Sequence, residues 1–232
     1  MIKIRHCADR GQADLGWLKA RYSFSFASYH DSEYMGFRDL RVINEDRIGP
    51  SGGFPMHSHN DMEIITYIID GELQHKDNMG NGSIISRGDI QRMTAGSGIT
   101  HSEFNPSSEN TTHLLQIWIE TEKPNLPPGY EDKNYAKAMR NNQLNLIVSK
   151  GGEERVAHIN QEVKIYNAVL DADREIAYSL DQNRHAWIQM IKGQISVNNV
   201  YMLEGDGAAI SEEKSLIISS VKDAEFLLFD LR

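Results

Sequence analysis

The sequence contains one cysteine, Cys7, among 232 residues. A single cysteine excludes an intramolecular disulfide, and it cannot supply the several thiolates of a structural zinc site. No run of about 18 apolar residues is present, and the first residues include no apolar stretch of signal-peptide length. These absences predict a cytoplasmic protein with no membrane partner.

Basic residues are in the minority, because 24 lysines and arginines stand against 33 acidic residues and give a formal net charge of -9. A surface of this sign repels phosphate backbones. No run of lysine and arginine forms a local basic arm. The composition therefore predicts no nucleic-acid partner.

Helical periodicity is also scarce, whereas short apolar and β-branched runs are frequent in the first half and are separated by glycine-rich turn clusters. Such spacing predicts a closed, all-β architecture rather than a parallel α/β sheet. One helix is predicted over residues 130–140, with the sequence YEDKNYAKAMR. The predicted strands of the first half cover residues 41–44, 63–69, 83–85, 90–93 and 114–119.

The second half repeats the pattern of the first. Residues 187–197 (WIQMIKGQISV) can be aligned with residues 64–75 (IITYIIDGELQH), which places Gly193 on Gly71. Repetition at this scale indicates two copies of one β domain. The predicted division is an N-terminal domain over residues 1–125, a connecting segment with the short helix over 126–144, and a C-terminal domain over 145–232.

Two pairs of polar residues with the same spacing are the candidate chemistry. In a strand, side chains at i and i+2 leave the same face, so His57 and His59 can point at one ion. His101 and Glu103 form a second such pair after a glycine-rich turn. Three neutral imidazoles and one carboxylate would leave a divalent cation with open coordination positions, as in catalytic rather than structural sites.

Other candidates are weaker. Glu63 has the strand parity of His59 and could point inward as a ligand, but Glu103 already supplies an anion, so we expect Glu63 to support the site without binding the metal. The other six histidines have no partner at i+2 and are expected to be surface or hydrogen-bonded core residues: His6, His30, His75, His113, His158 and His185. Among these six, His113 is the one expected to lie near the site as a supporting donor.

The first half of the chain resembles the pirin family, a subgroup of the cupin superfamily. The similarity covers about residues 10–120 and includes the segments GQADLGWL (11–18), LRVINED (40–46), HSHNDME (57–63) and HSEFNP (101–106). It implies a bicupin of two antiparallel β-barrel (jelly-roll) domains. It also implies one divalent transition metal held by His57, His59, His101 and Glu103, with iron first and nickel, manganese, cobalt, copper or zinc as alternatives. The C-terminal domain lacks a second HxH pair and is expected to hold no metal.

The resemblance extends to bacterial pirin-like quercetin 2,3-dioxygenases. It implies a metal-dependent oxidoreductase that cleaves the heterocyclic ring of flavonols with O2 and releases CO. On that hypothesis the catalytic base is Glu103, with Glu63 as the second candidate. The phenylalanines of the N-terminal half would line the entrance or fill the core: Phe24, Phe26, Phe37 and Phe54. Two alternatives stay open. One is an iron-binding, redox-sensing regulatory protein with protein partners, and the other is a cupin that acts on another small molecule, such as an α-keto or hydroxyenone metabolite.

Overall fold

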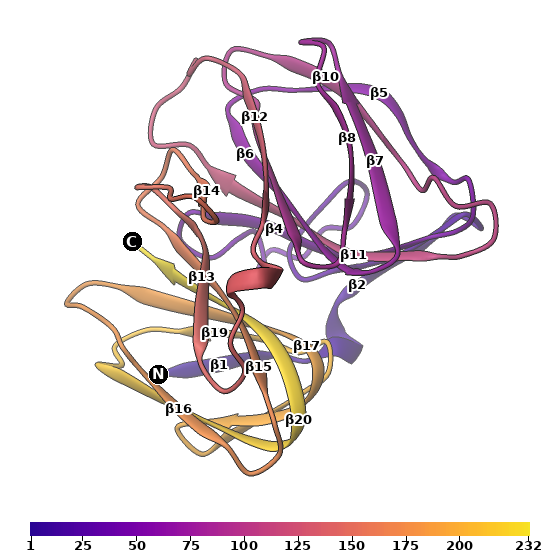
Figure 1. Ribbon diagram of the computed structural model, residues 1–232. Coiled ribbons are helices and arrows are strands. Elements are labelled where there is room, and N and C mark those ends of the chain that lie inside the picture. The colour runs from indigo at the N-terminus through magenta and orange to yellow at the C-terminus, as the bar shows by residue number, and fades with distance from the viewer. The chain divides into compact units, whose positions relative to one another are not determined.

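A computed structural model describes residues 1–232, and nearly all of its regular elements are strands (Figure 1). Two short 3-10 helices, η1 (Cys7–Asp9) and η2 (Ala136–Ala138), are the exceptions. The structure contains no helix with the length and apolar character needed to cross a membrane. The predicted all-β, antiparallel class is therefore confirmed.

The chain forms two compact units, and neither is continuous in sequence. Unit 1 comprises Met1–Arg10, Ala138–Lys150 and Glu162–Arg232, and unit 2 comprises Gly11–Lys137 and Gly151–Gln161. The sequence alone predicts that the chain passes only once from the N-terminal to the C-terminal domain, through the connecting segment over residues 126–144. The first ten residues instead join the C-terminal strands, because β1 (Ile2–Arg5) pairs with β19 (Gly207–Ile210).

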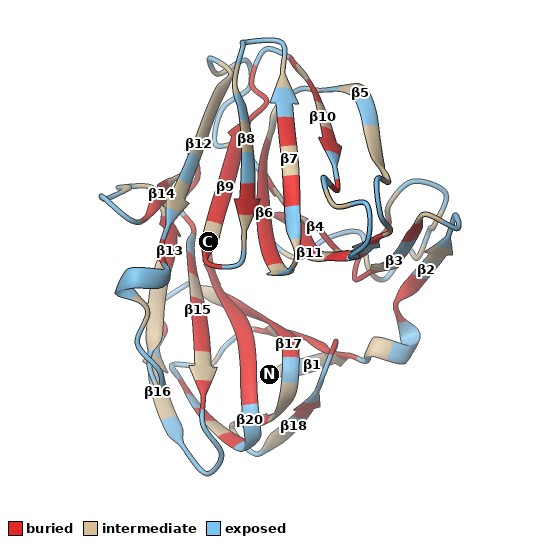
Figure 2. Cartoon of the chain, turned by 45° about the vertical axis from the view of Figure 1, so that its right-hand side comes forward, coloured by how far each residue is buried: buried red, intermediate tan, exposed pale blue.

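Unit 2 contains two antiparallel sheets, with the strand orders β12-β9-β6-β11-β4-β3-β2 and β5-β10-β7-β8. Burial alternates along several strands, as Figure 2 shows for β7, because one face of each strand points inward. The strands are β2 (Gly11–Asp14), β3 (Leu18–Tyr22), β4 (Leu40–Ile48), β5 (Gly53–His59), β6 (Met62–Asp70), β7 (Glu72–Asp77), β8 (Gly82–Ser86), β9 (Asp89–Thr94), β10 (Ile99–Phe104), β11 (Thr112–Glu120), β12 (Gly129–Asn134) and the two-residue β14 (Ala157–His158).

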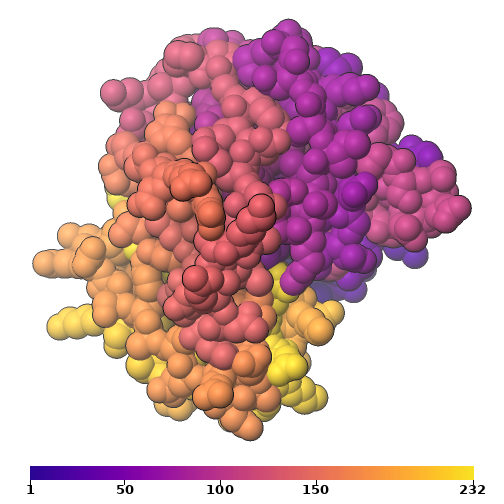
Figure 3. All heavy atoms as spheres, viewed as in Figure 1, coloured from indigo at the N-terminus to yellow at the C-terminus, as the bar shows by residue number.

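All five predicted strands of the first half are present, as the central parts of β4, β6, β8, β9 and β11. Most of their apolar residues are buried and form the core of unit 2. In the space-filling view, residues 72–86 of β7 and β8, in purple, form part of the exposed surface (Figure 3). β8 is one of the two edge strands of its sheet, the other being β5, and Ile84 on β8 is exposed.

The predicted helix over residues 130–140 is wrong. Residues Gly129–Asn134 form β12, which pairs along its whole length with β9, and only Ala136–Ala138 form a single turn, η2. The local sequence favours a helix only weakly, by roughly a few tenths of a kcal/mol per residue. Pairing with a neighbouring strand of a sheet overrides a preference of this size. β12 pairs with the edge of β9 that faces away from β6.

Unit 1 is built on one antiparallel sheet with the order β1-β19-β17-β20-β15-β13, to which β16 and β18 are added beside β20 and β17. Its core is almost wholly aliphatic and aromatic. The elements not yet given bounds are β13 (Leu144–Ser149), β15 (Lys164–Leu170), β16 (Glu175–Ser179), β17 (His185–Val197), β18 (Val200–Leu203) and β20 (Ser215–Leu231).

The internal repeat predicted from the sequence is visible in the strand pairing. In unit 2, β11 lies between β6 and β4, and in unit 1 β20 lies between β17 and β15. Gly71 and Gly193, which the alignment superimposes, both have φ of 79°. At Gly193 a Cβ atom would lie 2.0 Å from the carbonyl oxygen of Asp223, so only glycine fits there.

Candidate metal centre

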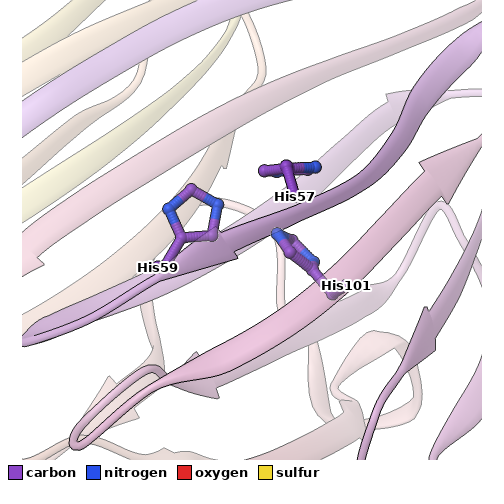
Figure 4. Close-up of side chains that lie close together, drawn as sticks. All are labelled: His57, His59 and His101. Carbon is purple, nitrogen blue, oxygen red and sulfur yellow. The ribbon is translucent and has the colours of Figure 1, made fainter.

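The centre is built on β10 and on its two neighbours in the sheet, β5 and β7. His57 and His59 leave the same face of β5 at i and i+2, and His101 of β10 is paired directly with His57. Figure 4 shows the three imidazoles converging from these two strands. Their ring centroids are 4.4 Å (His57 to His101), 4.8 Å (His57 to His59) and 4.9 Å (His59 to His101) apart.

Each of the three histidines offers a ring nitrogen within 4.8 Å of the others, the separation expected of ligands to one ion. Glu103 falls into a second group of this kind, with His101 and His75. The β5–β10 register shifts between His101 and Glu103, so Glu103 lies opposite Phe54 of β5 and opposite His75 of β7. His101 therefore belongs to both groups.

The Glu103 carboxylate is fully enclosed and held in one orientation. Gln116 of β11 donates its amide to both carboxylate oxygens, at 3.1 and 3.0 Å, and Thr66 of β6 donates its hydroxyl to the Gln116 carbonyl at 3.1 Å. Burial raises the pKa of Glu103, although the Gln116 hydrogen bond and the nearby His57 oppose the rise. The carboxyl group is accordingly suited to hold a proton in this cavity.

Two of the three histidines, His59 and His101, are held in the neutral form that metal ligands require. Burial, followed by His57, His59 and His75, lowers the pKa of His101 to about 3. Burial and the neighbouring His57 lower the pKa of His59 to about 4. Both imidazoles therefore keep a lone pair available at neutral pH.

The side chains fit a divalent transition metal. The Nε2 atom of His101 is buried and has no hydrogen-bond partner in the protein, a state that is costly unless a ligand completes it. Imidazole and carboxylate donors suit several first-row divalent ions. The His/Glu cluster thus has the donor set and the missing partner expected of a metal site, without selecting one metal.

His75 is a member of this cluster that the sequence interpretation did not select. It was expected to be a surface or hydrogen-bonded core residue, and it is indeed buried, but its Nδ1 atom lies 3.4 Å from Nδ1 of His101. Burial lowers the pKa of His75, although the nearby Asp77 opposes this. The available signal was the spacing His75-Lys76-Asp77, which repeats the i, i+2 arrangement of the other two pairs.

Glu63 and His113 do not join the cluster. Glu63 accepts hydrogen bonds from Thr94 and Asn160, at 2.9 to 3.1 Å. The shared strand parity with His59 does not apply, because β5 ends at His59 and the chain turns at Asp61, with φ of 49°, before β6 begins. His113 bonds Glu45 at 3.0 Å and lines no part of the cavity described next.

A cavity of about 310 Å³ opens beside the histidines, and all four expected ligands line it. Its remaining wall is mainly apolar and aromatic, including Tyr22, Phe26, Phe54 and Trp118. Trp118 packs edge-on against His59, with ring centroids 4.9 Å apart. Of the phenylalanines considered from the sequence, Phe26 and Phe54 line the cavity, whereas the buried Phe24 and also Phe37 do not.

Besides His101, two uncharged residues of this wall each carry a buried polar atom that has no hydrogen-bond partner in the protein. These atoms are the indole Nε1 of Trp118, a donor, and the amide Oδ1 of Asn44, an acceptor. Buried polar groups are normally paired, so these two atoms lack the partner that such groups usually have. The cavity combines apolar, aromatic walls with a cluster of metal-ligand side chains.

The paired antiparallel sheets and the histidine-lined cavity define the class of the molecule as a two-domain cupin. Residues 4–119 match the family model described as Pirin, and residues 146–231 match the model described as Quercetinase C-terminal cupin domain. The chain belongs to the pirin family.

Several known proteins are similar to the chain over all or nearly all of its length. Quercetin 2,3-dioxygenase of Escherichia coli is 41% identical over 231 residues, which span 100% of this chain and 99% of the relative. A pirin-like protein of Caulobacter vibrioides is 41% identical over 221 residues, which span 95% of this chain and 95% of the relative. The crystal structure of the bacterial pirin YhhW from Escherichia coli in complex with nickel(II) is 39% identical, with a TM-score of 0.95 over 100% of this chain and 99% of that one.

Proposed function

We propose that the protein is a metal-dependent dioxygenase that opens the heterocyclic ring of quercetin-like flavonols with O2. The observation that carries this proposal is the juxtaposition of three histidines and Glu103 with an apolar, aromatic cavity of about 310 Å³. That volume lies at the lower end of the range of small-molecule sites, about 300 to 1,000 Å³. The similarity to the Escherichia coli quercetin 2,3-dioxygenase supports the same substrate class.

His57, His59, His101 and Glu103 are the proposed ligands of one divalent ion. We place iron first among the candidate metals; the Escherichia coli relative supports nickel, because its solved complex contains nickel(II). When bound, such an ion supplies Lewis acidity and coordination positions for oxygen ligands. The remaining steps depend on the residues of the chain itself.

Glu103 is the proposed general base. Its buried carboxylate accepts the proton of the flavonol 3-hydroxyl. Gln116 keeps both carboxylate oxygens oriented during the transfer. The two atoms of O2 then add at C2 and C4, the C2–C3 and C3–C4 bonds break, C3 leaves with its own oxygen as CO, and a depside remains.

The cavity walls bind and orient the planar substrate. Phe26 and Trp118 meet edge-to-face, with centroids 5.4 Å apart, and present apolar surface to a flat ring system. These walls also exclude water from the reacting ring.

The test is reconstitution of metal-free protein under anaerobic conditions with iron, nickel, manganese, cobalt or copper. Quercetin absorbance and CO release are then followed after O2 is admitted. The proposal expects loss of absorbance and about one CO per quercetin with at least one metal, and no reaction with the analogue that lacks the 3-hydroxyl. Absence of turnover with every metal, in protein that retains the metal, overturns the dioxygenase assignment.

Matched variants separate the base from other buried carboxylates. Glu103→Gln should lower kcat by about 10²- to 10⁴-fold, the usual contribution of a general base. Glu63→Gln changes an equally buried carboxylate that lies outside the cavity and should leave kcat within about twofold of wild type. The reverse ranking would assign the base to Glu63.

A further inference from the structure

His75 lies on the opposite side of β10 from the histidines of β5. It is paired with Glu103 across the β7–β10 ladder, and its side chain is completely buried. Its ring centroid is 5.2 Å from that of His101, and the two Nδ1 atoms are 3.4 Å apart. One of these two nitrogens must donate the proton and the other must accept it.

Asp77 determines which nitrogen of His75 bears hydrogen. Its carboxylate accepts the backbone N–H groups of Met79 and Asn81, both at 2.9 Å, and the side-chain amide of Asn81 at 2.8 Å. Every one of these groups is a donor, as expected for an ionised acceptor. The remaining neighbour, Nε2 of His75 at 3.5 Å, therefore donates as well. A neutral imidazole has one N–H, so Nδ1 of His75 is an acceptor.

Gln91 supports the same assignment independently. Its Nε2 amide, which can only donate, faces Nδ1 of His75 at 3.5 Å. The orientation of this amide follows from Tyr130, whose hydroxyl donates to the Gln91 carbonyl at 3.4 Å. Tyr130 also stacks on the His75 ring, with centroids 4.6 Å apart and an interplanar angle of 26°. The ring of His75 is thus fixed in position and in polarity.

The consequence for His101 is that its Nδ1 donates to His75. Its other nitrogen, Nε2, then carries the lone pair, and this is the buried atom that has no partner in the protein. In the opposite tautomer, two lone pairs would face each other between the rings, and Nε2–H would be left without an acceptor. Both changes cost free energy in a buried site.

We propose that Asp77 and His75 form a positioning relay that fixes His101 as the Nδ1–H tautomer and so presents its Nε2 lone pair to the metal. His75 acts through His101 and touches neither metal nor substrate. Supporting partners of this type typically change metal affinity by about 10- to 100-fold. The relay rests on the proposed ligand role of His101, and its test therefore includes a measurement that needs no metal.

That measurement is the tautomeric state of the histidines in metal-free, ¹⁵N-labelled protein, read from long-range ¹H–¹⁵N NMR spectra. Wild-type protein should show His101 as the Nδ1–H form and His75 as the Nε2–H form. His101 found as the Nε2–H form overturns the relay, whether or not the protein binds metal. Failure of wild-type protein to bind any metal overturns the proposed function without affecting the tautomer result.

Two substitutions at position 75 separate the hydrogen bond from packing. In His75→Gln the amide can still accept from His101 and donate to Asp77, whereas His75→Leu can do neither. In calorimetric titrations with Ni²⁺, His75→Leu should bind about 10- to 100-fold more weakly, and His75→Gln should recover most of the affinity. Equal affinity of His75→Leu and wild type overturns the relay.

A spectroscopic signature and a control complete the test. The Co²⁺ derivative of His75→Leu should show a changed d–d spectrum, and that of His113→Leu, which removes a histidine bonded to Glu45 outside the cavity, should not. If His75→Leu does not fold, Asp77→Asn serves instead, because its amide can donate to His75 and should lower the Nδ1–H fraction of His101. Two metal equivalents per wild-type chain, with the second lost in His75→Gln, would instead make His75 a ligand and overturn the relay.

Discussion

His57 and His101 are direct partners across the antiparallel β5–β10 ladder, and their imidazole centroids lie 4.4 Å apart. The positions of the two rings are therefore set by backbone pairing between the strands and not by a loop. A slip of one residue in this register would move one of the rings to the opposite face of the sheet.

Metal binding should stabilise the folded protein through His101. Ni²⁺ at a free concentration of 100 times its Kd should raise the free energy of unfolding of wild type by about 2.7 kcal/mol, seen as a higher Tm. His101→Ala removes a central donor and should abolish the increase. His113→Ala, outside the cavity, should retain it. An undiminished Tm increase in His101→Ala would contradict the ligand assignment.

Glu63 should make stability depend on pH in a definite direction. Burial raises its folded-state pKa, despite opposing contacts from Asn160, Arg92 and Thr94. Between the unfolded-state pKa of about 4.5 and the raised folded-state pKa, Glu63 binds more protons in the folded state than in the unfolded state. The contribution of Glu63 to stability therefore falls as the pH rises through this window. Urea unfolding at several pH values should show wild type losing stability relative to Glu63→Gln over this window. A difference that grows with pH would contradict the prediction.

Gly96 precedes β10 and should not tolerate a side chain. Its φ is 48°, and a Cβ atom there would lie 1.9 Å from the carbonyl oxygen of Leu126. Gly16 also has a positive φ, 82°, but no atom lies within 4 Å of its Cβ position. Gly16→Ala should cost only the conformational strain, about 1 to 2 kcal/mol, and Gly96→Ala clearly more. Equal losses in denaturant unfolding would show that the backbone relaxes around Gly96.

Asp230 should be the critical member of a buried polar network in unit 1. It accepts hydrogen bonds from Tyr178 and from Nε of Arg184, both at 2.6 Å. Asp230→Ala leaves the largely buried guanidinium without its anion and should cost about 3 to 5 kcal/mol. Tyr178→Phe removes one hydrogen bond to a charged group and should cost about 1.5 to 3 kcal/mol. Thermal unfolding ranks the two variants, and a larger loss in Tyr178→Phe would be inconsistent with this assignment.

Much of the fold was accessible from residue pattern alone. Apolar runs such as 63–69 and 114–119 form β6 and β11, which pair with each other. A near-continuous apolar run is typical of a strand that is buried and paired with neighbouring strands on both sides. Residues 130–140 were mispredicted, because their helical pattern is weak and the free edge of β9 is not visible in the local sequence. The pairing of β1 with β19 was equally inaccessible, since it joins segments about two hundred residues apart.

The sequence by itself determined the all-β class, the internal repeat and the two i, i+2 pairs, because alternation along a strand is a local property of the backbone. Only the tertiary structure decided which pairs meet. It placed His57 opposite His101, turned Glu63 away from the cavity and brought His75 against His101. Strand order and register are set by burial and pairing across the whole sheet, so no local pattern could have specified these contacts.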